Sequence, residues 1–309
     1  MSGLVTGGAP PDFHRSGGCR LLGRVAANEP LGSQVRLTIN LPGWRGARPG
    51  QFAMLQAEPS RCFLGRALSI ADEVGERVSF MVAPIGEGTR ELCDLVPGDE
   101  VWALGPLGNG FDLEKIAASS GRLVIVAGGM GAAFFPLFLS AMADRCFAAR
   151  AGVAVKASEE SRWEVVVLLG FRDAFQSQGA AAVNEAALRL RQAGMSCRIE
   201  LVAEDGSHGP AQKVTDLLKR ELQAGDRVAV CGTWAMSRAV WRVCSAVSDV
   251  RAWFSLEMGM ACGVGSCHGC VITLADGSMA RVCHDGPVFA GESVFGREPA
   301  GDDREGGPV

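Results

Sequence analysis

Four cysteines near the C-terminal end of the chain have a spacing that suits metal chemistry. They form the pattern C-x4-C-x2-C-x12-C and are Cys262, Cys267, Cys270 and Cys283. The first three match a spacing typical of thiolate ligands to a [2Fe–2S] cluster, and the fourth thiolate is more distant. The pattern therefore predicts a [2Fe–2S] site that is built from these four side chains.

Three glycines between these cysteines fit the same prediction. A loop that wraps closely round a cluster needs backbone amides directed at sulfur and positions with positive φ, which Gly263, Gly265 and Gly269 can provide. A four-cysteine zinc site and four ordinary thiols are the competing interpretations. Zinc ribbons favour two separated C-x2-C pairs, whereas this segment has one.

A glycine turn follows the apolar run LVIV and precedes a helix-like segment. Gly128, Gly129 and Gly131 would let the backbone approach a pyrophosphate, whose charge the start of the helix would stabilise. The turn lacks the full G-x-G-x-x-G pattern, so a tight structural turn is the alternative.

Two further segments have the residue types of a diphosphate site. Arg66-Ala67-Leu68-Ser69 supplies a guanidinium and a hydroxyl, and Gly86-Glu87-Gly88-Thr89 supplies a glycine–threonine amide pair. Taken alone, the arginine is better explained as an ordinary residue on a barrel strand.

Cys231 ends an apolar strand-like run and is followed by Gly232-Thr233. The carboxyl edge of an open α/β sheet is where ligands bind, although a lone buried cysteine is also a common small core residue. His268 and His284 adjoin the cluster cysteines, and we interpret them as groups around the ligands or on the surface. The other six cysteines have no ligand spacing and are predicted to be core thiols, namely Cys19, Cys62, Cys93, Cys146, Cys197 and Cys244.

Length and composition exclude several classes of protein. The chain has 309 residues, 48% of them apolar and 21% charged, which is typical of a packed protein of about two domains. A net charge of −4 gives no reason to expect a nucleic-acid partner. No apolar run is long enough for a membrane span and no signal peptide is visible, so we expect a cytoplasmic protein with reduced cysteines.

The pattern of apolar residues divides the chain into three structured parts between two tails, residues 1–18 and 296–309. Short β-like runs separated by Pro-Gly turns predict an antiparallel barrel over residues 19–116. Strands alternating with helices predict a parallel-sheet α/β domain over residues 117–252, with an insertion at 144–162. Residues 253–295 are predicted to be a small cluster-binding segment.

Taken in order, these segments resemble the electron-transfer subunits of NAD-dependent dihydroorotate dehydrogenase, a branch of the ferredoxin–NADP reductase superfamily. The resemblance runs from Cys19 to Val294 and is most specific in SLEMGMACGVGSCHGC and RVCHDGPVF. Motifs shared across the superfamily add to it: RPGQFAML, RALSI, GEGTREL, GPLGNGF, LLGFRD and CGT.

The resemblance implies a flavin-binding barrel, an NAD-binding α/β domain and a [2Fe–2S] segment. It implies that FAD is held by Arg66, Ala67, Leu68, Ser69, Gly88 and Thr89, together with Met81, Val82 and Ala83 on the preceding strand. It places NAD at Gly128, Gly129, Gly131 and Cys231, and the cluster on the four cysteines.

The resemblance also implies a partner subunit and a path for the electrons. A separate FMN-containing subunit would oxidise dihydroorotate, for pyrimidine biosynthesis, and pass electrons through the cluster and FAD to NAD⁺, in a heterotetramer. The relay needs no general acid or base. The alternatives are a related FAD/[2Fe–2S] reductase that serves another redox partner and a non-catalytic iron–sulfur or zinc protein. The residues leave the choice between NAD and NADP open.

Overall fold

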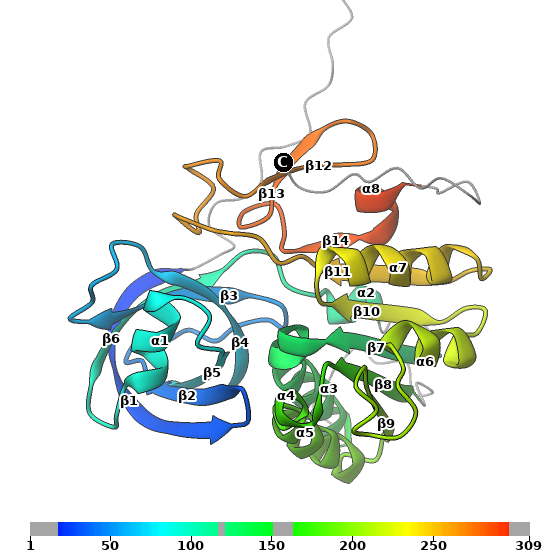
Figure 1. Cartoon of the computed structure of the whole chain (residues 1–309), viewed down its shortest axis with the longest axis horizontal. Helices are drawn as coiled ribbons and strands as arrows, with labels where there is room; N and C mark the ends of the chain where they lie inside the picture. Colours follow the sequence, from blue (N-terminus) through cyan, green and yellow to red (C-terminus); the bar gives the residue numbers. More distant parts are fainter. Residues whose placement is uncertain (1–17, 117–120, 151–162, 297–309) are drawn as a thin grey trace, which may run out of the picture.

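The computed structural model describes residues 18–116, 121–150 and 163–296, and Figure 1 shows their arrangement. Both predicted tails, apart from Gly18 and Gly296, lie outside these residues, as does 151–162 of the predicted insertion. Helix α3 (Phe135–Arg150) runs through residues 144–150, the first part of the predicted insertion.

The N-terminal part is a closed antiparallel barrel with strand order β1-β2-β5-β4-β3-β6. Alternate side chains such as Leu37, Ile39 and Phe80 are fully buried inside it, as the period of a strand requires. Helix α1 packs against β2, β3 and β5 and places Leu92 in the same core. The elements are β1 (Cys19–Leu31), β2 (Gln34–Asn40), β3 (Phe52–Glu58), β4 (Arg66–Val74), β5 (Arg77–Val82), α1 (Glu87–Asp94) and β6 (Glu100–Leu107).

The second part is a six-stranded sheet with order β14-β11-β10-β7-β8-β9, in which all strands but β14 are parallel. Strand β7 is buried on both faces, because Leu123 and Ile125 pack against α3 and α5 while Val124 and Val126 face the core shared with α6 and α7. The elements are α2 (Leu113–Ile116), β7 (Arg122–Gly128), η1 (Gly129–Phe134), α3, β8 (Glu164–Phe171), α4 (Ala174–Ser177), α5 (Ala180–Gln192), β9 (Ser196–Ala203), α6 (Val214–Glu221), β10 (Arg227–Cys231), α7 (Trp234–Ser245) and β11 (Arg251–Ser255).

The C-terminal part lies beside both the barrel and the sheet (Figure 1). A two-stranded hairpin of β12 (Val271–Thr273) and β13 (Met279–Arg281) follows the cysteine-rich loop. Strand β14 (Val288–Ala290) then pairs antiparallel with β11, and α8 (Gly291–Phe295) ends the described chain. The segment is therefore joined to the edge of the large sheet.

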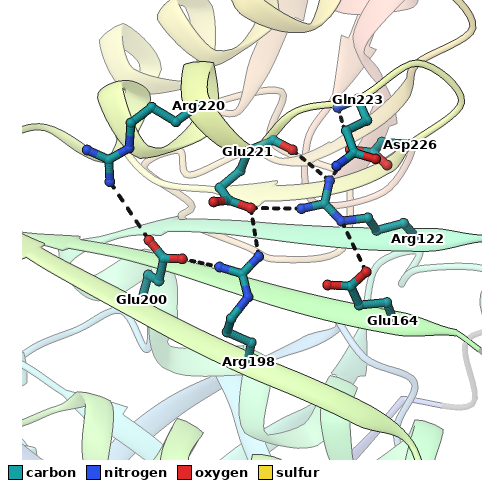
Figure 2. Close-up of polar contacts among 8 residues, drawn as sticks. All are labelled: Arg122, Glu164, Arg198, Glu200, Arg220, Glu221, Gln223 and Asp226. Carbon is teal, nitrogen blue, oxygen red and sulfur yellow. Dashed lines mark hydrogen bonds and ion pairs between the residues drawn. The ribbon is translucent and has the colours of Figure 1, made fainter.

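An ion-pair network joins the amino ends of the sheet strands (Figure 2). The glycine turn lies at the other, carboxyl end of β7. Arg122 at the start of β7 contacts Asp226 Oδ2 at 3.0 Å and Glu221 Oε2 at 2.8 Å. Arg198 on β9 reaches the same Glu221 oxygen at 2.7 Å. Because the side chains of Arg122 and Asp226 are 11% and 3% exposed, this part of the network is buried.

Candidate functional site

The β12–β13 hairpin brings two of the four predicted cluster cysteines together. Cys270 directly precedes β12 and Cys283 follows β13, and the Cys283 amide donates to Cys270 Sγ at 3.4 Å. The Gly265 amide donates to Cys283 Sγ at 3.1 Å and the Gly269 amide to Cys267 Sγ at 3.5 Å. Backbone amides thus point at sulfur, as expected for a loop that stabilises thiolates.

The four thiols form two pairs. The side chain of Cys262 neighbours that of Cys267, and the side chain of Cys270 neighbours that of Cys283. Within the described residues no three His, Cys, Asp or Glu side chains converge to hold a single metal ion. Two thiol pairs suit the two irons of a [2Fe–2S] cluster, so the residues present fit that group.

The two pairs differ in their surroundings. Burial acts to raise the pKa of Cys262, but hydrogen bonds from the Cys267 and Val264 amides outweigh it and lower that pKa to about 6. Burial and the neighbouring Cys270 raise the pKa of Cys283 to about 12. Cys270 and Cys283 are buried while Cys267 is exposed, so the site has an inner and an outer edge.

Positive φ occurs at two of the three glycines for which we expected it. Gly263 and Gly265 have φ values of 70° and 80°. Gly269 does not share this conformation, and the left-handed residue at that turn is His268, with φ of 59°. His268 is exposed beside Cys267, whereas His284 packs under Gly265 and its Nδ1 lies 2.8 Å from Asp285 Oδ1.

The predicted diphosphate residues meet at the start of α1. Arg66 opens β4, and its guanidinium packs so closely on Gly88 that a Cβ at position 88 would collide with it. The Thr89 hydroxyl donates to the Gly86 carbonyl at 3.0 Å and accepts from the Gly86 amide at 2.9 Å, which fixes the first turn. A guanidinium beside a helix N-terminus is suited to an anion, so these residues fit the diphosphate of FAD.

The remaining predicted flavin residues lie along the adjoining strands. Ala67, Leu68 and Ser69 are partly exposed on β4. In the described part of the chain the Ser69 hydroxyl makes no hydrogen bond, so its donor is available to a ligand.

On the next strand, Met81 is buried between the barrel and the second domain. It packs in a small group of buried apolar side chains that includes Ala133. Val82 is fully buried inside the barrel core, so only its backbone can face a ligand, and Ala83 follows the strand end.

The predicted nucleotide residues gather at the carboxyl ends of β7 and β10. Gly128 ends β7, and a six-residue 3₁₀ helix, η1, follows it where we expected α-helix. Gly131 packs directly on the backbone of Cys231, so that any Cβ there would collide. The Met236 side chain lies against both Gly128 and Gly232. This clustering at one sheet edge is the place where open α/β sheets bind ligands.

Glu257 is a residue of this edge that the sequence analysis missed. Strands β10 and β11 are parallel with Cys231 opposite Ser255, so Glu257 emerges beside Cys231. The Cys231 thiol donates to Glu257 Oε1 at 3.9 Å. The residue Glu257 as a whole is exposed, but its carboxyl group is buried, and this burial raises the pKa of Glu257. Burial and the nearby Glu257 carboxylate raise the pKa of the Cys231 thiol. The parallel strand ends were the signal that could have found it.

The prediction of six core thiols is only partly correct. Cys197 and Cys244 are buried, whereas Cys19, Cys62, Cys93 and Cys146 are partly exposed. Burial raises the pKa of Cys244 to about 12 and of Cys197 to about 11.

Comparison with known proteins connects this geometry to a family. The protein-family model "Iron-sulfur cluster binding domain of dihydroorotate dehydrogenase B" matches residues 257–295. The "Dihydroorotate dehydrogenase B (NAD(+)), electron transfer subunit" of Clostridium perfringens is 34% identical over 79% of this chain and 86% of its own length. Its counterpart in Caldanaerobacter subterraneus subsp. tengcongensis is 31% identical over 89% of this chain and 98% of its own length. The chain belongs to the family of dihydroorotate dehydrogenase B electron transfer subunits.

Solved structures agree on the fold. The protein described as "NADH-dependent reduced ferredoxin-NADP oxidoreductase" matches 88% of this chain and 89% of its own, with a TM-score of 0.65 and 25% identity. A ferredoxin NADP+ reductase from Neisseria gonorrhoeae, solved with FAD and NADP, matches 72% of this chain and 89% of its own, with a TM-score of 0.56 and 17% identity.

These matches confirm several predictions made from the sequence. The barrel plus parallel-sheet architecture, the oxidoreductase electron-transfer function and the cofactor set of FAD, [2Fe–2S] and NAD are those of this family and fold. An electron transfer subunit implies a catalytic partner subunit. None of the helices in the described residues is long and apolar enough to span a membrane.

Proposed function

We propose that this chain relays electrons between an FMN-containing dihydroorotate dehydrogenase subunit and NAD, and that the residues described above hold its cofactors. Cys262, Cys267, Cys270 and Cys283 ligate the cluster. Arg66 and the start of α1, at Gly88 and Thr89, bind the FAD diphosphate. The family whose electron transfer subunits match this chain supports this function.

The arrangement of the thiols is the observation that carries the proposal. The inner pair is buried against the core shared by the barrel and the sheet, and the outer pair reaches the surface at Cys267. When bound, FAD exchanges two electrons with a nicotinamide and single electrons with an iron–sulfur cluster. The exposed edge at His268 is the face that we assign to the partner subunit.

The nicotinamide dinucleotide binds at the carboxyl edge of the sheet. Gly128, Gly129 and Gly131 admit its pyrophosphate, and Cys231 with Glu257 lines the place for the nicotinamide. The protein works in the cytoplasm, in a heterotetramer with the catalytic subunit.

Co-expression of the full chain with the FMN subunit tests this function. We expect a co-purifying complex with the mass of two copies of each subunit, which forms NADH when dihydroorotate is added. NADP in place of NAD should give a much slower rate. A chain that carries FAD and the cluster yet neither binds that subunit nor supports dihydroorotate oxidation would instead be a reductase for another partner, and the proposal would fail.

A further inference from the structure

Asn109 is an exposed residue at the end of the barrel and lies against the segment that follows the last cluster cysteine. It belongs to the motif GPLGNGF and lies two residues after the end of β6. Its Nδ2 donates to the carbonyl of His284 at 2.9 Å and to that of Asp285 at 3.2 Å. Its backbone amide donates to the Gly286 carbonyl at 2.6 Å. One residue of the barrel domain thus holds three consecutive carbonyls just after the cluster cysteine Cys283.

A second contact fixes the other end of the cysteine-rich segment on the same part of the barrel. Gly263, next to Cys262, packs on Met54 and Leu107, and a Cβ there would lie 2.7 Å from Met54 Cγ and 3.0 Å from Leu107 Cδ1. Met54 pairs across β3–β4 with Ala67 of the proposed flavin site. The segment is therefore anchored to the barrel at both of its ends, through β3 and the end of β6.

We propose that Asn109 is a positioning residue that fixes the cluster-binding segment on the flavin barrel. The proposal rests on the function proposed above. An electron relay needs its two cofactors held at a set separation, and the contacts of Asn109 set the place of the segment that carries Cys283. The side chain and the backbone amide of Asn109 bind the carbonyls of residues 284–286, and Asn109 acts through that backbone.

The chemistry of the side chain makes the role testable. An amide offers two N–H donors, and the acceptors of Asn109 Nδ2 are the carbonyl oxygens of His284 and Asp285. Aspartate has the same shape but at neutral pH presents only acceptor oxygens to those carbonyls. Asn109→Asp should therefore release the segment at least as strongly as Asn109→Ala, whereas a residue that only filled space would tolerate aspartate.

The experiment uses the full chain with its cofactors bound. Amide hydrogen exchange is followed in residues 262–270 and 281–286, and bleaching of the visible cluster absorbance by an iron chelator is timed. Both hydrogen bonds are solvent-exposed, so their loss should speed exchange in 281–286 by about 5-fold in both Asn109 variants, and bleaching should accelerate in the same order. The rate at which NADH reduces the flavin should stay at the wild-type value.

Asn28 provides a matched control in the barrel. Its Nδ2 also donates to two carbonyls, those of Cys93 and Leu95, each at 2.8 Å. Asn28→Asp should loosen the end of α1 and leave the exchange of 281–286 and the bleaching rate unchanged.

Three results would overturn the proposal. The first is wild-type amide exchange of residues 281–286 in Asn109→Asp, and the second is cluster bleaching that Asn28→Asp accelerates as much as the Asn109 variants do. The third is loss of flavin from the Asn109 variants as readily as loss of the cluster. A wild-type chain that binds neither cofactor would defeat the proposed function instead, while exchange in 281–286 would still decide the role of Asn109.

Discussion

Arg122→Met tests how the buried ion pairs support the sheet that carries the nucleotide site. Methionine keeps much of the volume of the side chain but removes the partner of Asp226, whose side chain is 3% exposed. Among the described residues, the carboxyl of Asp226 would then keep only the amide of Gln223, which donates to its Oδ2 at 2.9 Å. Glu221 would still be paired with Arg198.

The expected cost follows from the unpaired buried carboxylate. Breaking a buried pair by removing one partner costs about 3–5 kcal/mol, which would speed the exchange of the slowest amides of β7 and β10 by about 10²- to 4 × 10³-fold at pH 7. Native-state hydrogen exchange suits a chain with several domains, because it reports the free energy of opening of each strand. Arg24→Met provides the control, since the Arg24–Glu100 pair at 2.5 Å is 65% and 34% exposed and should contribute at most about 1 kcal/mol.

The stability lost in Arg122→Met should depend on pH in a direction that can be checked. Burial already raises the pKa of Asp226, and Arg122 opposes that rise. Without Arg122 the pKa rises further, so the loss of stability is full above that pKa and shrinks as the pH falls through it and the carboxyl is protonated. Adding Asp226→Asn to Arg122→Met should recover at least about half of the loss. A loss of stability below about 1 kcal/mol in Arg122→Met would refute this reasoning. So would a loss that neither low pH nor Asp226→Asn reduces.

Three further predictions concern the sites themselves. Gly88→Ala should displace the Arg66 guanidinium and weaken FAD binding by about 10- to 100-fold in a fluorescence titration, the loss of one charge-assisted hydrogen bond. An affinity equal to that of the wild type would contradict the role of the Arg66–Gly88 contact. Gly263→Ala should lose cluster absorbance, because the added Cβ would lie 2.7 Å from Met54. Gly277→Ala is the control, since Gly277 has a similar φ of 84° but open space around it, and it should keep the cluster. Equal losses of cluster absorbance in the two variants would contradict the steric argument. Glu257→Gln should slow flavin reduction by NADH in stopped-flow absorbance and leave the cluster spectrum unchanged, and an unaltered rate would remove Glu257 from the nicotinamide site.

The sequence was sufficient where local pattern and spacing determine structure. The alternation in the barrel strands and the apolar strands of the sheet predicted both architectures, and the cysteine spacing predicted the thiols that the hairpin brings together. The sites depended on contacts between distant segments, which spacing does not reveal. The Arg66–Gly88 contact, the approach of Glu257 to Cys231 and the role of Asn109 arise only when strands far apart in the chain become neighbours.

Local conformation at single residues was also beyond the sequence. His268, not Gly269, takes the positive φ in the cluster loop, because the fold of the whole loop decides which residue turns. Likewise η1 replaces the expected first turns of α-helix after β7, where Gly131 packs on Cys231.

An anaerobic titration of the purified full chain with NADH tests the central claim most directly. Flavin absorbance near 450 nm and the low-temperature electron paramagnetic resonance signal of the cluster are recorded at each addition. The account predicts that the flavin band bleaches and that the signal of a reduced [2Fe–2S] cluster appears in the wild type, while Cys283→Ser loses the signal and Cys62→Ser keeps it. A chain without a flavin band, or one that binds zinc in place of iron, would contradict the account.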